Sequence, residues 1–356
     1  KMGGITMRNW VAMFMVVVLH CNAFGENMRN TEPLTLNWLG IWFLEKISIV
    51  AVNCYVLISG YFLITSEFKY RKLFSIWFQV LFYSICIYFV MGIIYGWGSM
   101  FTLMHSFLPV STKSYWFATT YLALYAISPF LNIAIRSMAK IQMQGCILVL
   151  VIIFSLWPSL LPFVSLLDGS NGYGIIWFVL LYLIAAYIRL YQPQKSINRK
   201  YPLLIYFAIV LLSMLCLIVE QKVSFPWTAA FQRYNGIGVL IASLSVFVYF
   251  LGIDFKQARV NKIIVGMSGL TFGVYLIHEN FLVREHLYTD WLNMPSYVNT
   301  QYQVLYIITC ALGIYIISSL IEYLRQKLFL ILRIDILMQK LDTCITKHIS
   351  RFKAYL

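Results

Sequence analysis

The chain has 356 residues, of which 61% are hydrophobic, 17% aromatic and only 11% charged, and its formal net charge is +14. Soluble domains carry about 25% charged residues, so this composition excludes an ordinary soluble domain. Apolar runs of about 20 residues recur along the whole chain, which is typical of helices that cross a membrane. The length of these runs excludes an outer-membrane barrel, whose strands are short and alternate in hydrophobicity.

The apolar runs predict an all-α, polytopic membrane protein with about ten transmembrane helices. In chain order the predicted spans cover residues 5–24, 42–63, 73–98, 115–135, 143–165, 173–191, 202–220, 236–253, 267–283 and 303–322. The links between them are short, and none is long enough to separate two domains. We therefore predict a membrane domain over residues 1–322 and a cytoplasmic tail over residues 323–356.

The lysines and arginines predict the orientation of these spans. If the N-terminus is cytoplasmic, ten spans return the C-terminus to the cytoplasm, and 21 of the 27 basic residues then fall on the cytoplasmic side. Basic residues favour that side, so the net charge is explained without a nucleic-acid partner. The tail interleaves Leu, Ile and Phe with Lys and Arg, which predicts an amphipathic helix bound to membrane lipids.

The seven cysteines are scattered along the chain and form no CxxC pair. Most of them lie inside apolar runs, where a free cysteine behaves as a small hydrophobic residue. The sequence therefore predicts neither a disulfide framework nor a metal site.

His20 is the first candidate for chemistry. It lies near the end of the run "MRNWVAMFMVVVLHC" (7–21), about 22 Å along the first predicted span and therefore in the outer half of the membrane. An ionisable residue inside a span is expensive and often functional. The residues alone leave two interpretations open: a catalytic group, or a polar side chain that bonds to a neighbouring helix.

Two further ionisable residues lie at the outer end of the ninth predicted span. His278 and Glu279 close the segment "SGLTFGVYLIHEN" (268–280), at nearly the same depth as His20. Adjacent residues on a helix point in different directions, so we expect these two side chains to address different partners.

The inner and outer ends of other spans hold weaker candidates. Lys69, Arg71 and Lys72 precede or open the third span; they are either an orientation signal or a phosphate site. On the outer side, Tyr115 is expected to be an interfacial aromatic residue, and the span it opens is expected to break at Pro129. Outer residues that could hold an acceptor sugar are His278, Glu279, Trp116, Arg233 and Asn235.

Several segments in this order are similar to the acyltransferase-3 family of integral membrane acyltransferases. They are "VAMFMVVVLH" (11–20), "NCYVLISGYFL" (53–63), "FKYRK" (68–72), "YWF" (115–117) with "YLALYAISPFLN" (121–132), and "TFGVYLIH" (271–278). The resemblance covers nearly the whole chain. It implies O-acylation of cell-surface carbohydrates in bacteria, with acyl-CoA (most simply acetyl-CoA) as the donor on the cytosolic side of the inner membrane. It also implies that His20 is the essential catalytic group.

The resemblance implies a basic group early in the first span and arginines at the start of the third. Arg71 matches the latter, with Lys69 and Lys72 beside it, and together with Arg8 these residues are expected to bind the donor phosphates. The family places an arginine eleven residues before its histidine, but position 9 is Asn here and Arg8 is one residue early. Eleven steps of about 100° bring two side chains to one helix face, whereas twelve leave them about 120° apart.

A non-enzymatic alternative is a flippase or transporter of lipid-linked glycan, which would also explain ten spans and outer aromatic residues. Transporters often have helices broken by Gly or Pro at corresponding positions of two halves, and no such pair is evident. A glycan polymerase or ligase is disfavoured because the outer loops are short.

Overall fold

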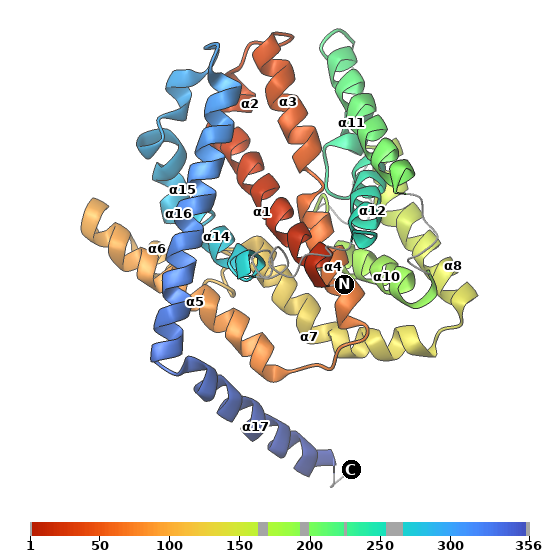
Figure 1. Cartoon of the computed structure of the whole chain (residues 1–356), viewed down its shortest axis with the longest axis vertical. Coiled ribbons are helices and arrows are strands. Elements are labelled where there is room, and N and C mark those ends of the chain that lie inside the picture. Colours follow the sequence, from red (N-terminus) through yellow and green to blue (C-terminus); the bar gives the residue numbers. More distant parts are fainter. Residues whose placement is uncertain (1, 163–169, 193–198, 224–225, 254–265, 354–356) are drawn as a thin grey trace.

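The computed structural model describes residues 2–162, 170–192, 199–223, 226–253 and 266–353, and only the backbone of residues 2–8, 226–227 and 348–353. Within these ranges the chain is helical and contains no strand. The elements, shown in Figure 1, are α1 (Met2–Phe24), α2 (Asn27–Asn30), α3 (Leu36–Ser48), α4 (Ala51–Leu63), α5 (Tyr70–Tyr95), α6 (Met100–Phe107), α7 (Trp116–Ser137), α8 (Lys140–Val151), η1 (Ile152–Leu156), α9 (Trp157–Leu160), α10 (Ile175–Tyr191), α11 (Lys200–Glu220), η2 (Pro226–Phe231), α12 (Ile237–Leu251), α14 (Thr271–His278), α15 (Phe281–His286), η3 (Leu287–Trp291), η4 (Met294–Tyr297), α16 (Gln303–Ile331) and α17 (Ile334–Lys353).

Among the described residues, six helical segments are long and apolar enough to cross a bilayer, which confirms an all-α protein with several membrane-spanning helices. They are Leu36–Leu63, Tyr70–Tyr95, Trp116–Ser137, Lys140–Leu160, Lys200–Glu220 and Gln303–Ile331. Shorter apolar helices occupy the first, sixth and eighth predicted spans, and the 8-residue α14 lies within the ninth. The number of about ten crossings and the cytoplasmic position of both termini stay predictions.

Helix α7 does not break at Pro129, as the sequence led us to expect, but continues to Ser137. Proline has no N–H to donate to the carbonyl four residues earlier, which here belongs to Tyr125. The Ser128 hydroxyl donates to that carbonyl at 2.7 Å and replaces the missing bond. Serine commonly satisfies the backbone groups that proline frees in membrane helices.

Two large buried apolar clusters, with a smaller third one around Tyr206, hold the described helices together. One lies among α4, α7, α10 and α12 and includes Trp177 and Tyr182. The other lies among α1, α5, α14 and α16. Helices α4 and α10 approach closely because Gly60 has no side chain: a Cβ there would lie 2.9 Å from Tyr182 Cα. This tight packing holds the helices that form the walls of the site described below.

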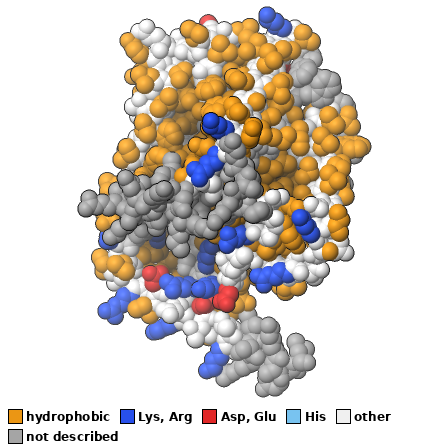
Figure 2. Space-filling view, turned by 45° about the vertical axis from the view of Figure 1, so that its right-hand side comes forward, with side chains coloured by type: hydrophobic (Ala, Val, Ile, Leu, Met, Phe, Trp, Pro, Cys, Tyr) orange, Lys and Arg blue, Asp and Glu red, His pale blue; other side chains and the backbone are white. Residues whose placement is uncertain are grey.

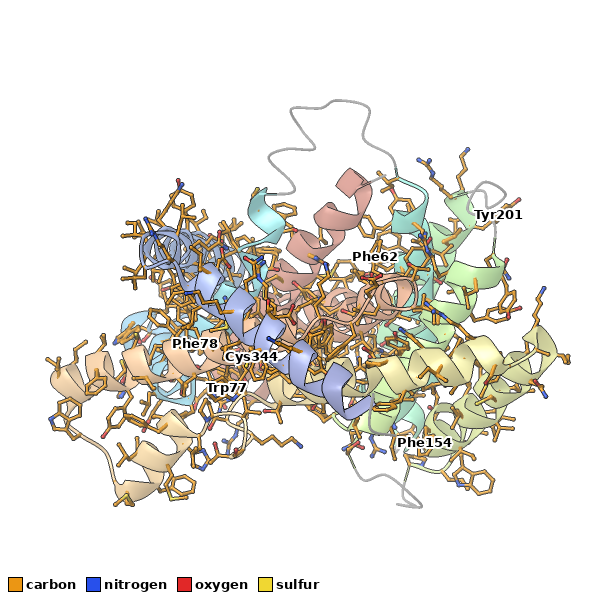
Figure 3. All side chains as sticks on the ribbon, turned by 90° about the horizontal axis from the view of Figure 1, so that it is seen from below. Phe62, Trp77, Phe78, Phe154, Tyr201 and Cys344 are labelled. Atoms are coloured by element: carbon orange, nitrogen blue, oxygen red, sulfur yellow. The ribbon has the colours of Figure 1, made fainter. Side chains whose placement is uncertain are left out.

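The C-terminal helices differ from the predicted boundary at residue 322. Helix α16 continues to Ile331, and Arg333, whose φ is 54°, turns the chain into the separate helix α17. Helix α17 crosses the lower end of the bundle against α5 (Figures 1 and 3). An Arg71–Asp335 ion pair of 3.2 Å and a 3.0 Å bond from the Arg71 backbone N–H to Asp342 fix this contact. Binding of the tail to lipid stays a prediction.

The surface suits a hydrocarbon environment. On the face drawn in Figure 2, apolar side chains cover the upper and middle part, whereas Lys and Arg side chains gather toward the lower end. Large apolar residues such as Leu211 on α11 and Ile316 on α16 are exposed. Because water would oppose so much apolar exposure, these faces are explained by contact with lipid.

Candidate active site

A cavity of about 290 Å³ runs along one face of helix α1. Its wall on α1 consists of Asn9, Met13, Val16 and His20, at the four-, three- and four-residue spacing of a single helix face. At 1.5 Å per residue, about 16 Å of helix separates the two ends of this wall. The remaining walls come from α4, α5, α7, α14 and the segment before α12: Val52, Tyr55, Ile58, Ser59, Ile76, Gln79, Trp116, Phe117, Tyr121, Tyr234, Thr271, Phe272 and Tyr275.

His20, at one end of the cavity, contacts both outer residues of α14. Its Nδ1 lies 3.0 Å from His278 Nε2 and 3.2 Å from Glu279 Oε2. His278 Nδ1 lies 2.6 Å from the carbonyl oxygen of Val274, which can only accept a hydrogen bond. His278 therefore carries its proton on Nδ1, and in its neutral form its Nε2 accepts from His20 Nδ1. This chain of bonds leaves His20 Nε2 with a free lone pair, the state that a base or nucleophile needs.

The expectation that His278 and Glu279 address different partners is wrong. Glu279 caps α14, keeps helical backbone angles and donates its N–H to the carbonyl of Tyr275 at 3.1 Å. The two side chains therefore leave the helix in different directions, and both still reach His20 Nδ1 because α1 packs against α14. Glu279 is 4% exposed, and its other oxygen, Oε1, accepts a 3.0 Å bond from Arg284 Nη1.

Bonds around Tyr115 hold the end of α14 in place. The Tyr115 hydroxyl donates to the carbonyl of Leu276 at 3.1 Å and accepts from Asn280 Nδ2 at 2.6 Å. Tyr115 is 1% exposed, so it is a buried anchor and not the expected interfacial residue. The ring of Phe24 lies beside His20 and under the Arg284 guanidinium, with centroid distances of 5.3 Å and 4.6 Å. These contacts position His278 and Glu279 against His20.

Only one of the five outer residues expected to hold a sugar lines the cavity. Trp116 does, and its ring stacks near Tyr234, which also lines it. Arg233 and Asn235 instead donate to the backbone carbonyls of Pro162 and Phe154, at 3.4 Å and 3.0 Å. The two side chains next to Tyr234 are therefore used to fix the segment that carries it, and they lie outside the cavity wall.

The basic residues at the start of α5 lie under the C-terminal helix. Lys69 is the residue before α5 and bonds through its backbone to Tyr125, whose ring also faces the Lys72 ammonium at 5.0 Å. Arg71 pairs with Asp335 of α17. None of these three residues lines the cavity. The side chain of Arg8 lies outside the described residues.

Asn9, the position where the resemblance expects an arginine, faces the cavity. Its side-chain oxygen is buried and has no hydrogen-bond partner among the described residues, while its backbone carbonyl accepts from Tyr55 at 2.6 Å. Tyr275 also lines the cavity, and its buried hydroxyl has no hydrogen-bond partner in the part of the chain that the structure describes. The eleven-residue spacing thus does place position 9 and His20 on one face, as helix geometry requires.

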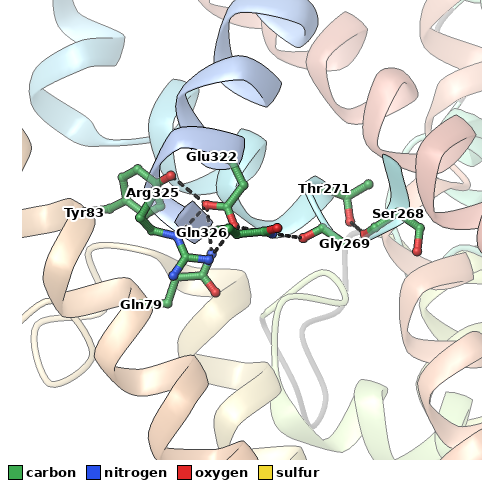
Figure 4. A network of polar contacts seen from close by, with 8 residues as sticks. All are labelled: Gln79, Tyr83, Ser268, Gly269, Thr271, Glu322, Arg325 and Gln326. Carbon is green, nitrogen blue, oxygen red and sulfur yellow. Dashed lines mark hydrogen bonds and ion pairs between the residues drawn. The ribbon is translucent and has the colours of Figure 1, made fainter. Parts of the chain in front are cut away.

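A second polar network, which we did not predict, surrounds a fully buried carboxylate on α16 (Figure 4). Glu322 accepts from Tyr83 at 2.6 Å, from Gln79 at 3.3 Å and, through both oxygens, from Arg325 at 2.9 and 2.6 Å. Gly273 on α14 makes room for it, because a Cβ there would collide with the carboxylate. Since Gln79 also lines the cavity, this network fixes part of its wall. An acidic residue in an apolar run is the sequence signal that could have indicated this network. It was missed because Glu322 was taken as the last residue of a predicted span.

Comparison with known proteins identifies the family of the chain. A family model described as an acyltransferase domain matches residues 10–332, which is nearly the whole chain. The match includes His20 and the segment that carries His278 and Glu279. Searches of curated proteins and of solved structures found no match. The chain belongs to the acyltransferase-3 family and is a membrane acyltransferase.

Proposed function

We propose that the protein transfers an acyl group, most simply acetyl, from cytosolic acyl-CoA to a hydroxyl of a cell-surface or lipid-linked carbohydrate. The observation that supports this most is that one continuous cavity extends from His20 to Asn9. Asn9 lies close to the predicted cytosolic end of α1. Such a cavity can admit a long, narrow donor from one side of the membrane and present its reactive end to an acceptor from the other.

His20 is the proposed general base. Its Nε2 takes the proton of the acceptor hydroxyl while that oxygen attacks the thioester carbonyl. The C–S bond of the tetrahedral intermediate then breaks, and the departing sulfur receives the proton from His20. The His20 ring is positively charged between these steps, and the carboxylate of Glu279 at 3.2 Å stabilises that charge. His278 and Glu279 thus act on His20 in this proposal, and not on the sugar as expected from the sequence.

The donor runs along the face of α1. The apolar side chains of Met13 and Val16 line its middle part, whereas Asn9, Tyr275 and Gln79 offer polar atoms to the amides of the pantetheine arm. Lys69, Arg71, Lys72 and Arg8 stay the proposed partners of the donor phosphates. Arg71 is paired with Asp335. The phosphates of the donor must therefore compete with the Asp335 carboxylate for the Arg71 guanidinium.

The acceptor is proposed to bind at the His20 end of the cavity. Trp116 and Tyr234 stack there with a 27° angle between their rings and supply the aromatic faces on which sugars commonly pack. Arg233 and Asn235 support this segment from behind. Their proposed role is therefore to position Tyr234. The proposed location is the inner membrane of a bacterium, as the resemblance implies.

The test uses purified protein in vesicles, acyl-CoA labelled in its acyl group, and a lipid-linked glycan extracted from the native host. We expect the label to appear on the glycan as an alkali-labile ester, with release of one CoA per ester formed. A flippase or transporter would move the glycan without consuming acyl-CoA. Absence of acyl-CoA consumption in the presence of the native glycan would contradict the proposed donor.

A further inference from the structure

A second and larger hollow lies on the outside of the bundle, between helices α5 and α16. This lateral groove has a volume of about 990 Å³ and is closed at its back by α14, α15 and η3. Its lining is almost entirely apolar and includes Phe82, Val90, Ile94, Ile317 and Leu324. Several of these side chains are exposed. In a membrane protein such a groove meets lipid and not water.

The groove is long enough to follow a hydrocarbon chain through the membrane. On α16 its wall extends from Tyr306 to Leu328. At 1.5 Å per residue this is about 33 Å, close to the hydrocarbon thickness of about 30 Å. Aromatic and polar groups mark the end near Tyr306, where the Trp291 indole donates to the hydroxyl of Tyr95 at 2.6 Å. Such groups are typical of a membrane interface.

The groove reaches the candidate active site. His278, which contacts His20 at 3.0 Å, forms part of its back wall. Arg284 lies in sequence between the groove residues Val283 and Leu287. Its side chain is 36% exposed, and among the described residues Nη1 is the guanidinium nitrogen that donates a hydrogen bond, to Glu279. Arg284 itself does not line the groove: its guanidinium lies over the ring of Phe24 on α1, beside His20.

We propose that the lateral groove holds the hydrocarbon chain of a polyprenyl phosphate that carries the acceptor sugar. The chain lies along α16, and the sugar is presented at His20. The length of the groove, which matches the whole hydrocarbon thickness, and its continuity with His278 favour this occupant over a bulk phospholipid, whose chains each span a single leaflet. This proposal rests on the proposed acyl-transfer function, because it names the lipid that carries the acceptor sugar of that reaction.

Gly313 allows a sharp test. It lines the groove, and a Cβ added there meets no atom within 4 Å, so the side chain of Gly313→Phe leaves the helix into the open space of the groove. Gly145 on α8 is the matched control, because it is also helical, also open to added side chains and not part of the groove. The probe is a diazirine-bearing long-chain polyprenyl phosphate in nanodiscs of phosphatidylethanolamine and phosphatidylglycerol, with crosslinked peptides identified by mass spectrometry.

We expect crosslinks on α5 and α16, and we expect unlabelled polyprenyl phosphate to compete for them. Gly313→Phe should lower the amount of crosslinking about tenfold, equal to about 1.4 kcal/mol of binding, whereas Gly145→Phe should leave it unchanged. Equal competition by phosphatidylglycerol, or crosslinking that Gly313→Phe leaves unchanged, would overturn the proposal. Binding of labelled acyl-CoA to the same variants reports separately on the proposed function. If acyl-CoA fails to bind while the crosslinks behave as expected, the groove stands and the donor assignment fails.

Discussion

Two histidines and a glutamate share one hydrogen-bonded system at the end of α1. The carbonyl of Val274 fixes the proton on His278 Nδ1, and His278 in turn orients the ring of His20. Such an arrangement sets which ring nitrogen is a base by hydrogen bonding at the other one. The chemistry of His20 therefore depends on residues more than 250 positions later in the chain.

Glu279→Gln tests the charge in this system. The amide keeps the shape of the side chain but removes the negative charge beside the protonated form of His20. We expect kcat to fall about tenfold to a hundredfold, with the KM for acyl-CoA unchanged. The matched control is Glu285→Gln, an exposed glutamate on the neighbouring helix α15. A change in KM alone, or an equal loss in the control, would contradict this role.

Asn9→Arg tests the register of α1. Because Asn9 faces the cavity with an unpartnered oxygen, an arginine there can reach a donor phosphate or carbonyl. We expect the KM for acyl-CoA to fall about tenfold, the gain from one charge-assisted contact. Asn9→Met has a similar reach without the charge and serves as the control. If both variants give the same KM in steady-state assays, position 9 does not contact the donor.

At the scale of helices, Glu322 joins α5, α14 and α16. It bonds to Gln79 and Tyr83 on α5, pairs with Arg325 on its own helix, and occupies the space left by Gly273 on α14. Gln326 adds a 3.0 Å bond to the carbonyl of Gly269 near the start of α14. This network fixes the helix that carries His278 from the end opposite to Tyr115.

Removing one partner of the Glu322–Arg325 pair should destabilise the bundle. Glu322→Leu leaves a buried guanidinium without its carboxylate, so we expect a loss of about 3–5 kcal/mol in the free energy of unfolding. The double variant Glu322→Leu with Arg325→Leu removes both charges and should recover most of it. Thermal unfolding in detergent micelles measures both. A double variant as unstable as the single one would show that the charges themselves are not the cause.

The apolar helices and the presence of an imidazole inside the first of them were predictable from the sequence, but the arrangement around His20 was not. Apolar runs long enough to span a membrane mark α5, α7, α11 and α16, and an imidazole in such a run marks His20. The contact of Glu279 and His278 with His20 depends on how α1 packs against α14, which no periodicity in the sequence gives. Glu322 was missed because predicted span ends are uncertain by a few residues, and α16 continues nine residues further.

At the scale of the whole molecule, the cavity and the lateral groove lie on two sides of the His20–His278 pair. Asn9 and Gln79 line only the cavity, whereas Arg325 and Ile317 line only the groove. In the proposed reaction the donor occupies the first and the carrier of the acceptor the second. The histidine pair is then the point where two substrates from opposite sides of the membrane meet.

The central claim is that His20 performs the acyl transfer. Its most direct test is His20→Ala, measured as transfer of labelled acyl groups from acyl-CoA to native glycan by purified protein in vesicles. His105→Ala is the matched control, because His105 also bonds to a neighbour, Ser114 at 3.0 Å, but lies outside the cavity. We predict that His20→Ala lowers kcat by about 10²–10⁴-fold with acyl-CoA binding intact, and that His105→Ala does not. Transfer by folded His20→Ala protein at the wild-type rate would contradict the account.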